Sequence, residues 1–280
     1  MLLGEECHKF GISLFQITPD NITELYSPIL NCEITFRAFW DRASDTDPRF
    51  LPIVELATDL SLYCINHHEQ ALRSHDKAIM HLTLIDAGLY TPYTIILPSY
   101  EEQPDIPDID LSPIGKPFII KPAHGGGGVG VVFKASSLPQ VTAARKEYPG
   151  DKYLLQANIV PTCFDSRPAW FRVISFAGNI YPCWWDTHTH VYKQVTTSEE
   201  NLYSLGPLRG IAATIARLSE LDLFSTEIAL TEAGIFVIVD YVNDQIDLRL
   251  QSKADDGVPD DIVHDITKCV PPLVASHCPR

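Results

Sequence analysis

Hydrophobic residues after position 117 fall into short runs. These runs are rich in β-branched and aromatic residues and are separated by glycine, proline and polar residues. They predict β-strands, because branched and aromatic side chains pack well on a pleated, half-buried surface. The predicted strands cover residues 118–121, 131–134, 153–160, 169–176, 180–185, 225–231 and 235–242.

Three other segments have the pattern of a helix. Apolar residues recur at helical spacing through residues 69–87, and Gly88 follows as a terminating residue. Residues 207–221 begin with Pro207, which suits a first helical turn, and a third helix is predicted over residues 259–270. Strands that follow one another as hairpins, with few helices between them, predict an α+β fold rather than a doubly wound sheet.

One segment separates these patterns. Residues 98–117 contain five prolines and five acidic residues, so we expect an exposed linker there. We predict a short N-terminal α/β lobe over residues 1–68, a part with a glycine-rich loop over residues 69–160, and a C-terminal part over residues 161–280.

Composition and charge restrict the possible functions. The 280 residues are 45% hydrophobic and 20% charged, as in ordinary globular proteins. With 21 Lys and Arg against 36 Asp and Glu, the net charge of −15 argues against binding to nucleic acid or to an anionic membrane. The seven cysteines show no zinc-like spacing, and no apolar stretch approaches the length of a membrane span. We therefore expect a cytoplasmic protein.

The most informative motif is a glycine-rich loop between two predicted strands. Gly125, Gly126, Gly127 and Gly128 are consecutive, and Gly130 follows. The backbone amides of such a loop can approach phosphate without obstruction by Cβ atoms. A dinucleotide-binding loop would precede a helix, and a P-loop would end in Gly-Lys-Ser/Thr; neither holds here. A flexible hairpin over nucleotide phosphates is favoured, with a surface turn as the simpler alternative.

Further short segments occur in a characteristic order around this loop. They are Asp76-Lys77, Leu-Ile-Asp-Ala-Gly-Leu-Tyr-Thr-Pro-Tyr-Thr at 84–94, Phe-Ile-Ile-Lys-Pro at 118–122, and residues 155–159, 171–173 and 234–244. In this order they resemble the ATP-grasp superfamily, and in particular carboxylate–amine ligases such as glutathione synthetase. The resemblance covers about residues 66–247. It implies an ATP-grasp fold whose two α+β subdomains, here 69–160 and 161–280, hold ATP between them.

The resemblance also implies which residues bind ATP. Lys77 and Lys121 match two lysines that contact the phosphates. Arg172 matches an arginine at the γ-phosphate or the substrate, which makes Lys121 and Arg172 the catalytic candidates; a cross-strand ion pair is the alternative for Arg172. Residues 156–159 match the adenine-binding segment, although Ala157 stands where the family commonly has an acidic residue. The full set implied for ATP is Lys77, Lys121, His124, Gly125, Gly126, Gly127, Gly128, Gly130, Gln156, Asn158 and Ile159.

Mg²⁺ is the second implied cofactor, bound by carboxylate and amide oxygens. Glu227, Asp240 and Asn243 match the metal positions, with Asp244 and Asp247 as alternatives for the third. The family usually has one residue between the last acid and the asparagine. Two residues separate Asp240 from Asn243, which would turn their side chains to opposite faces of a strand unless a β-bulge intervenes.

The resemblance implies an ATP- and Mg²⁺-dependent ligase. Such an enzyme activates a small carboxylate as an acylphosphate and joins it to an amine, with ADP and phosphate as products. A small-molecule kinase on the same fold and a nucleotide-binding protein without turnover stay open as alternatives. Arg37 and Arg42 of the N-terminal lobe are candidates for binding the substrate carboxylate, although a charged loop explains them equally well. A homodimer would fit the habit of the family.

Overall fold

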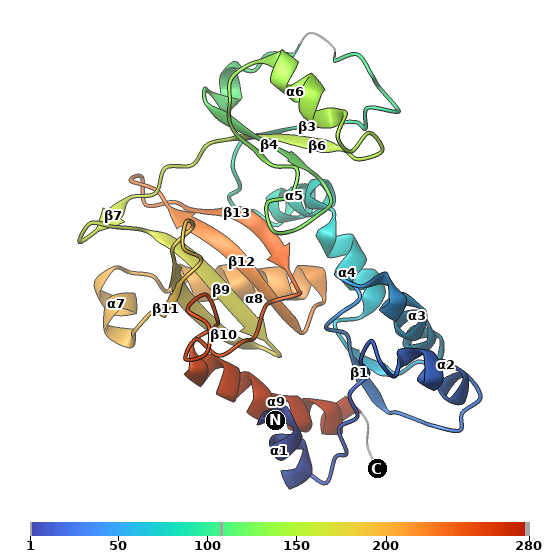
Figure 1. Ribbon diagram of the computed structural model, residues 1–280. Coiled ribbons are helices and arrows are strands. Elements are labelled where there is room, and N and C mark those ends of the chain that lie inside the picture. Colours follow the sequence, from blue (N-terminus) through green and yellow to red (C-terminus); the bar gives the residue numbers. More distant parts are fainter. Residues whose placement is uncertain (1, 107–108, 278–280) are drawn as a thin grey trace.

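The structure is a computed structural model that describes residues 2–106 and 109–277. Figure 1 shows a smaller sheet with a covering helix at the top, a larger sheet in the centre, and a helical N-terminal lobe at the lower right; the smaller sheet has four strands and the larger has five. The C-terminal helix crosses below the five-stranded sheet and lies beside the N-terminal helix. This arrangement confirms the predicted α+β class.

The N-terminal lobe combines helices with a two-stranded parallel sheet. Its helices are α1 (Leu2–Lys9), α2 (Ile22–Leu30) and α3 (Leu51–Asp59), with a 3₁₀ turn, η1 (Pro48–Phe50), and its strands are β1 (Ala38–Trp40) and β2 (Tyr63–Ile65). α2 and α3 share a small apolar core, whereas α1 packs on the C-terminal helix α9 (Asp260–His277). Packing therefore joins the lobe to the C-terminal part of the chain.

The helix predicted over residues 69–87 is in fact two helices, so that prediction was wrong in one respect. α4 (His68–His75) ends, and α5 (Lys77–Asp86) begins, at Asp76. The Asp76 carboxylate accepts hydrogen bonds from the backbone nitrogens of Ala78 and Ile79, at 2.8 and 3.0 Å. Asp76 thus has extended backbone and caps a new helix, which the apolar spacing alone does not reveal.

The four-stranded sheet is antiparallel throughout, in the order β3-β6-β4-β5. Its strands are β3 (Thr94–Leu97), β4 (Phe118–Pro122), β5 (Val132–Ala135) and β6 (Tyr153–Ala157). α6 (Leu138–Arg145) covers one face, where Phe118, Ile120 and Leu155 are fully buried. The strand predicted over residues 153–160 was too long, since β6 ends at Ala157.

The expected linker over residues 98–117 does not separate two parts of the chain. It joins β3 to β4 inside one sheet, and it contains a short 3₁₀ turn, η2 (Ser112–Ile114), in which Ile114 is buried. Pro107 and Asp108 of this segment lie outside the described residues. The segment is mostly exposed, as expected, but the prediction that it links two separate parts was wrong, because a loop rich in proline and acidic residues can also connect two strands of one sheet.

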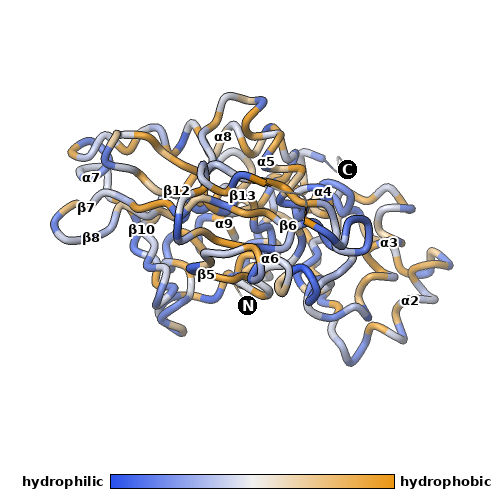
Figure 2. The backbone as a smooth tube through the Cα atoms, turned by 90° about the horizontal axis from the view of Figure 1, so that it is seen from above, coloured by the Kyte–Doolittle hydropathy of each residue, from blue (hydrophilic) through white to orange (hydrophobic). Residues whose placement is uncertain are grey.

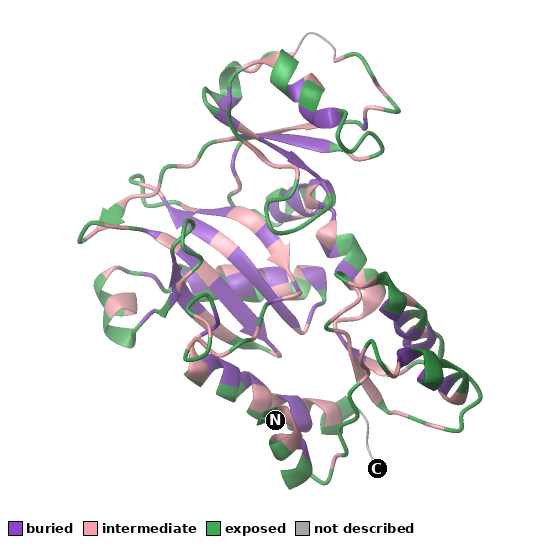
Figure 3. Ribbon diagram, viewed as in Figure 1, coloured by how far each residue is buried: buried purple, intermediate pink, exposed green. Residues whose placement is uncertain are grey.

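The five-stranded sheet, in the order β11-β10-β9-β12-β13, forms the centre of the molecule and is antiparallel throughout. Its strands are β9 (Trp170–Phe176), β10 (Asn179–Trp185), β11 (Tyr192–Gln194), β12 (Leu223–Leu230) and β13 (Phe236–Asn243). α8 (Pro207–Ser219) packs on one face with Phe171 and Val173, and α9 packs on the other with Ile174 and Phe176. Figure 3 shows the buried character of these strands, and Figure 2 shows hydrophobic residues along them.

The remaining elements lie at the edges of this sheet. They are the short hairpin of β7 (Cys163–Phe164) and β8 (Arg167–Pro168), and α7 (Thr197–Leu202), which begins with a capping box.

α9 extends seven residues beyond the predicted end at residue 270, with Pro271 and Pro272 inside it. The ring of His277, its last residue, stacks on Tyr63 at 4.0 Å. α9 therefore continues past two prolines, although proline usually interrupts a helix, and its last residue packs on the N-terminal lobe.

Candidate nucleotide and metal site

Lys121 lies buried where the two sheets meet. It is on β4, and its Nζ donates a hydrogen bond to the carbonyl oxygen of Val239 on β13 at 3.1 Å. The same nitrogen lies 5.1 Å from the centroid of the Tyr241 ring. The pKa of the Lys121 ammonium is lowered to about 8, chiefly by burial; the charge of Lys77 contributes to this shift, whereas Asp240 and Glu227 of the neighbouring sheet oppose it. The residue is therefore a buried cation held against the other sheet.

Lys77 connects α5 to the glycine-rich hairpin. Its backbone nitrogen donates to the carbonyl oxygen of Ala123 at 2.9 Å, and its Nζ donates to the carbonyl oxygen of Gly125 at 2.5 Å. Because the charge of Lys77 contributes to the lowered pKa of Lys121, the two lysines act on one region. The structure thus brings together the two lysines expected at the phosphates.

The glycine-rich loop joins β4 to β5 as a hairpin, as the strand–loop–strand prediction required. Gly125, Gly127 and Gly128 have positive φ angles, where side chains are rarely tolerated, and so does Gly130. A Cβ atom on Gly130 would lie 2.7 Å from the Tyr148 ring. This loop therefore needs glycine for its backbone conformation and, at Gly130, for space as well.

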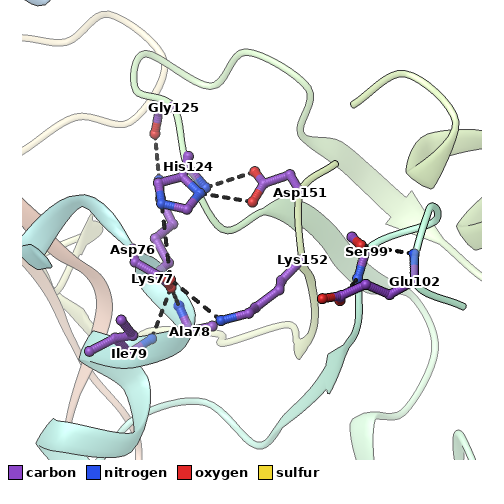
Figure 4. A network of polar contacts seen from close by, with 10 residues as sticks. All are labelled: Asp76, Lys77, Ala78, Ile79, Ser99, Glu102, His124, Gly125, Asp151 and Lys152. Carbon is purple, nitrogen blue, oxygen red and sulfur yellow. Dashed lines mark hydrogen bonds and ion pairs between the residues drawn. The ribbon is translucent and has the colours of Figure 1, made fainter. Parts of the chain in front are cut away.

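A polar network holds the base of this hairpin (Figure 4). The backbone nitrogen and Nδ1 of His124 both contact the carboxylate of Asp151, at 2.9 and 2.8 Å. The Asp76 carboxylate lies 4.0 Å from His124 Nε2 and 3.7 Å from Lys152 Nζ. His124, implied as an ATP ligand, is thus placed beside the hairpin with one ring nitrogen already engaged; its contact with ATP stays a prediction.

The hairpin also borders a pocket of about 350 Å³. Its lining residues come from the loop and from the turn before β6, and they are Pro122, His124, Gly125, Val129, Tyr148, Gly150 and Asp151. Val129, between the last two glycines, is 60% exposed. The loop therefore stands over open space rather than packing against the core.

The segment for which adenine binding was predicted has an unexpected anchor. The Gln156 side chain points inward and donates from Nε2 to the Tyr241 hydroxyl at 2.6 Å and to Thr94 Oγ1 at 3.1 Å. Asn158 and Ile159 follow the end of β6, where Asn158 is exposed and Ile159 half-buried. These positions leave the adenine assignment as a prediction, and they give Gln156 a structural role that the sequence did not suggest.

Charged residues form a row across the five-stranded sheet. Arg172 on β9 pairs with Glu227 on β12, which pairs with Asp240 on β13. Arg172 Nη1 lies 3.5 Å from Glu227 Oε1, Arg172 Nε donates to Ser225 Oγ at 3.0 Å, and Trp170 Nε1 donates to Glu227 Oε2 at 3.2 Å. Burial raises the pKa of Glu227, Arg172 opposes this shift, and Asp240 adds to it. The cross-strand ion pair considered for Arg172 is therefore present.

A bulge decides where Asn243 lies. Glu227 pairs with Asp240, and Ser225, two residues earlier on β12, pairs with Asn243, three residues later on β13. Residues two apart on a strand share a face, and directly paired residues lie on the same side of the sheet. Asn243 therefore shares the face of Glu227 and Asp240, despite the extra residue.

The alternative metal ligands are engaged elsewhere. Asp244 is buried and contacts His75 Nε2 at 2.5 Å, whereas Asp247 is exposed and pairs with Arg249. Arg42 is also committed: its guanidinium donates to the carbonyl oxygens of Asp244 and Ile246. Its expected role at the substrate carboxylate gains no support, because those carbonyls occupy the group.

The described residues contain neither a cluster of metal-binding side chains nor a membrane-spanning helix. Within residues 2–106 and 109–277, no group of three or more His, Cys, Asp and Glu side chains could hold a metal ion, so the candidate site consists of two carboxylates and one amide. In the same ranges, no helix has the length and apolar character needed to cross a membrane.

Comparison with solved structures defines the class of fold. The chain superposes on a RimK domain ATP-grasp protein from Sphaerobacter thermophilus with a TM-score of 0.64 and 19% identity, over 95% of this chain and 92% of that one. It superposes on D-alanine–D-alanine ligase from Bacillus anthracis, solved with ATP, with a TM-score of 0.62 and 14% identity, over 97% and 93% of the two chains. This protein therefore has the ATP-grasp fold.

A third similar structure is that of an ATP-grasp ligase. The ATP-grasp ligase PsnB, solved with a minimal precursor, Mg and ADP, superposes with a TM-score of 0.53 and 14% identity, over 87% of this chain and 78% of that one. No family model matches the sequence, and no curated protein is similar to it. At these identities the likeness establishes the fold alone.

Two buried residues of the site had no motif in the sequence. Tyr241 contacts both Lys121 and Gln156, and His81 contacts the Tyr241 hydroxyl. The sequence offers one signal for Tyr241, its position directly after the candidate ligand Asp240, which places it on the opposite face of the strand. His81 resembles any other residue of an apolar helix face.

Proposed function

We propose that the chain is an ATP- and Mg²⁺-dependent ligase that joins a small carboxylate to an amine. The observation that carries the proposal is the placement of Lys121, a buried cation on one sheet, within electrostatic reach of Glu227 and Asp240 on the other. A buried cation next to paired carboxylates suits the phosphates of a metal-bound nucleotide. Similar structures described as ligases with ATP, or with Mg and ADP, support this assignment.

The residues present fit Mg²⁺. Glu227, Asp240 and Asn243 offer hard oxygen donors from one face of the sheet, and burial together with Asp240 makes the charged form of Glu227 costly. A cation would therefore be favoured there. Bound at these residues, Mg²⁺ would neutralise charge on the phosphate oxygens of ATP.

The protein groups have separate tasks in this scheme. Lys121 and Lys77 attract the phosphates, and the amides of the glycine hairpin close over them. Arg172, next to the paired carboxylates, stabilises the charge that develops on the transferred phosphoryl group. The hairpin excludes water, which would otherwise hydrolyse an acylphosphate.

The proposed reaction has two steps, phosphoryl transfer and amide formation. A substrate carboxylate oxygen bonds to the γ-phosphorus of ATP while the bond from that phosphorus to ADP breaks. The amine nitrogen then bonds to the acyl carbon, inorganic phosphate leaves, and the amine loses a proton. Catalysis of both steps relies on alignment and electrostatic stabilisation, which the residues above provide.

Two measurements test the proposal. MgATP at 100 times its dissociation constant would stabilise the fold by about 2.7 kcal/mol, which raises the unfolding midpoint by several degrees. Pools of small carboxylic acids are then screened for ADP release with hydroxylamine as a general nucleophile, which converts an acylphosphate into a stable hydroxamate. Lys121→Ala is the negative control for both.

The outcomes separate the three candidate functions. A hydroxamate formed from one acid supports the ligase. ADP release with a stable phosphorylated alcohol and no hydroxamate would replace it with the kinase. A Mg²⁺-dependent midpoint shift without turnover on any pool would favour the nucleotide-binding protein, and no shift at millimolar MgATP would reject the nucleotide site.

A further inference from the structure

Tyr241 stands at the junction of three structural elements. Its side chain leaves β13 on the face opposite to Asp240, and its hydroxyl lies 2.6 Å from Gln156 Nε2 on β6 and 2.7 Å from His81 Nδ1 on α5. Tyr241 and Gln156 are 1% exposed and His81 is 4% exposed. These buried groups form a hydrogen-bonded chain between the two sheets.

The chain has a defined direction. An amide nitrogen can only donate, so the Tyr241 oxygen accepts from Gln156 and keeps its own proton to donate to His81 Nδ1. Burial lowers the pKa of His81 to about 4, with a further contribution from the charge of Lys121, so the imidazole is neutral near pH 7 and its nitrogen can accept. The Gln156 amide nitrogen, the Tyr241 hydroxyl and His81 Nδ1 therefore each have a hydrogen-bond partner.

Each element in this chain also carries part of the proposed site. β6 leads into the segment implied for adenine, α5 begins with Lys77, and β13 carries Asp240 and Asn243. The Tyr241 ring lies under the Lys121 ammonium. One phenol thus contacts the elements that present the adenine segment, both lysines and the metal ligands.

β13 depends on such side-chain anchors because its ladder is irregular. The register of β12 and β13 shifts on both sides of the Glu227–Asp240 pair. Bulges interrupt the backbone hydrogen bonds that normally fix a strand. Side-chain hydrogen bonds support this stretch instead. Thr226 Oγ1 donates to the Asp240 carbonyl oxygen at 3.0 Å, Lys121 Nζ donates to the Val239 carbonyl oxygen at 3.1 Å, and the Tyr241 hydroxyl bonds to Gln156 and His81.

We propose that Tyr241 is a positioning residue that couples nucleotide binding to Mg²⁺ binding. Its hydroxyl fixes the metal-binding strand β13 against the adenine-side strand β6 and against α5. Loss of the hydroxyl lets β13 shift relative to the nucleotide, so that Mg²⁺ adds less to nucleotide affinity. This inference rests on the proposed function, since it assumes that ATP and Mg²⁺ bind at this junction.

The test is Tyr241→Phe, which removes the hydroxyl and keeps the ring beneath Lys121. ADP binding is measured by calorimetry across a Mg²⁺ titration, so the readout is independent of turnover. In wild type, Mg²⁺ strengthens ADP binding by some factor; in Tyr241→Phe we expect that factor to fall about tenfold at low millimolar Mg²⁺, equivalent to about 1.4 kcal/mol. Excess Mg²⁺ should largely restore ADP affinity, which would not happen if the site had collapsed.

Tyr153→Phe is the matched control. The Tyr153 hydroxyl is equally buried and donates to the Ala144 carbonyl oxygen at 2.6 Å, on the α6 face of the four-stranded sheet, away from Lys121. We expect Tyr153→Phe to lower stability without changing the effect of Mg²⁺ on ADP affinity. His81→Gln, which keeps an acceptor for the Tyr241 hydroxyl, should retain most of the coupling.

The outcomes distinguish this inference from the proposed function. If Tyr241→Phe keeps the full wild-type effect of Mg²⁺, or if Tyr153→Phe loses as much of it, Tyr241 is not a positioning residue although the nucleotide site stands. If wild type binds ADP neither with nor without Mg²⁺, the proposed function fails and this inference fails with it.

Discussion

Asp240 lies directly opposite Glu227 where β12 and β13 pair, and the register of the two strands shifts on either side of that pair. The shift beyond Asp240 places Asn243 opposite Ser225 and returns its side chain to the face of the two carboxylates. An irregular pairing is thus what brings three oxygen donors to one face. Bulges often occur next to active sites, where they change the direction of a side chain.

The first prediction concerns Asp240→Asn. The amide is close in size to the carboxylate but removes one of two neighbouring negative charges, so affinity for Mg²⁺ should fall at least about hundredfold. The stability of the free protein should change little, because the substitution removes repulsion between Asp240 and Glu227 but also removes attraction between Asp240 and the buried Lys121 ammonium. Mg²⁺ titration of ADP binding and thermal unfolding measure the two effects.

Asp247→Asn is the control for Asp240→Asn. Asp247 is an exposed carboxylate paired with Arg249, and we expect its loss to leave Mg²⁺ affinity within about twofold, because exposed ion pairs contribute little. Equal losses in both variants would show that Asp247 belongs to the metal site and would overturn the choice of Asn243 as the third ligand.

The second prediction is a pH dependence of MgATP binding through Lys121. The pKa of this ammonium in the free protein is about 8, and only the charged form attracts phosphate. MgATP affinity should therefore change little between about pH 7 and 7.5 and decrease as pH rises above 8, by up to about tenfold per unit, until the raised pKa of the complex is passed.

Lys121→Arg provides the control, since a guanidinium stays protonated throughout this range. The variant should bind MgATP more weakly at pH 7 and show no decrease between pH 7.5 and 9.5. A wild-type affinity that is constant over that interval would contradict the assignment of Lys121 to the phosphates.

Local sequence patterns predicted much of the fold. Each strand run around the glycine loop and through the C-terminal part contains a strand, and most of these strands bury apolar residues such as Ile120, Val173 and Ile228. The break at Asp76 was not predictable from apolar spacing, which continues across it. The length of α9 was also not predicted. Pro271 and Pro272 suggest an end to the helix, whereas the residues after them pack on the N-terminal lobe, a contact that the local sequence does not reveal.

The sequence predicted those parts of the candidate site in which a residue type has a characteristic role, such as lysine or glycine near phosphate. Lys77, Lys121 and the glycines were identifiable from their order, and the structure brings them together. The sequence could not show whether Asp240 and Asn243 share a face of the strand, because this depends on a bulge and therefore on the pairing of β12 with β13. Tyr241 and His81 could not be found at all, because their role arises from contacts between residues 85 or more positions apart.

The third prediction concerns Gly130→Ala. Gly130 has a φ of +72°, and an added Cβ would lie 2.7 Å from the Tyr148 ring, so the variant must strain its backbone and displace Tyr148. We expect a loss of about 1–3 kcal/mol in the free energy of unfolding and a weaker affinity for MgATP. Denaturant unfolding and calorimetry measure these losses.

Gly126→Ala is the matched control in the same loop. No atom lies within 4 Å of an added Cβ there, and its φ is outside the left-handed region. Its stability should be unchanged or raised by up to about 1 kcal/mol through reduced freedom of the unfolded chain. Equal destabilisation of both variants would mean that the loop is packed differently.

The last prediction is that His81 sets part of the sensitivity of the fold to acid. Burial lowers the pKa of its imidazole from 6.5 to about 4 in the folded chain. Between pH 6.5 and 4, His81 is therefore protonated in the unfolded chain but neutral in the folded chain. This difference lowers the free energy of unfolding by up to roughly 3 kcal/mol over that interval. His81→Gln cannot titrate and still offers an acceptor to the Tyr241 hydroxyl, so its free energy of unfolding should fall less steeply from pH 6.5 to 4, even if it is lower at pH 7. His188→Gln, in an exposed hairpin, should follow the wild-type curve. Parallel curves for wild type and His81→Gln in denaturant titrations across this range would show that His81 is not a buried neutral imidazole.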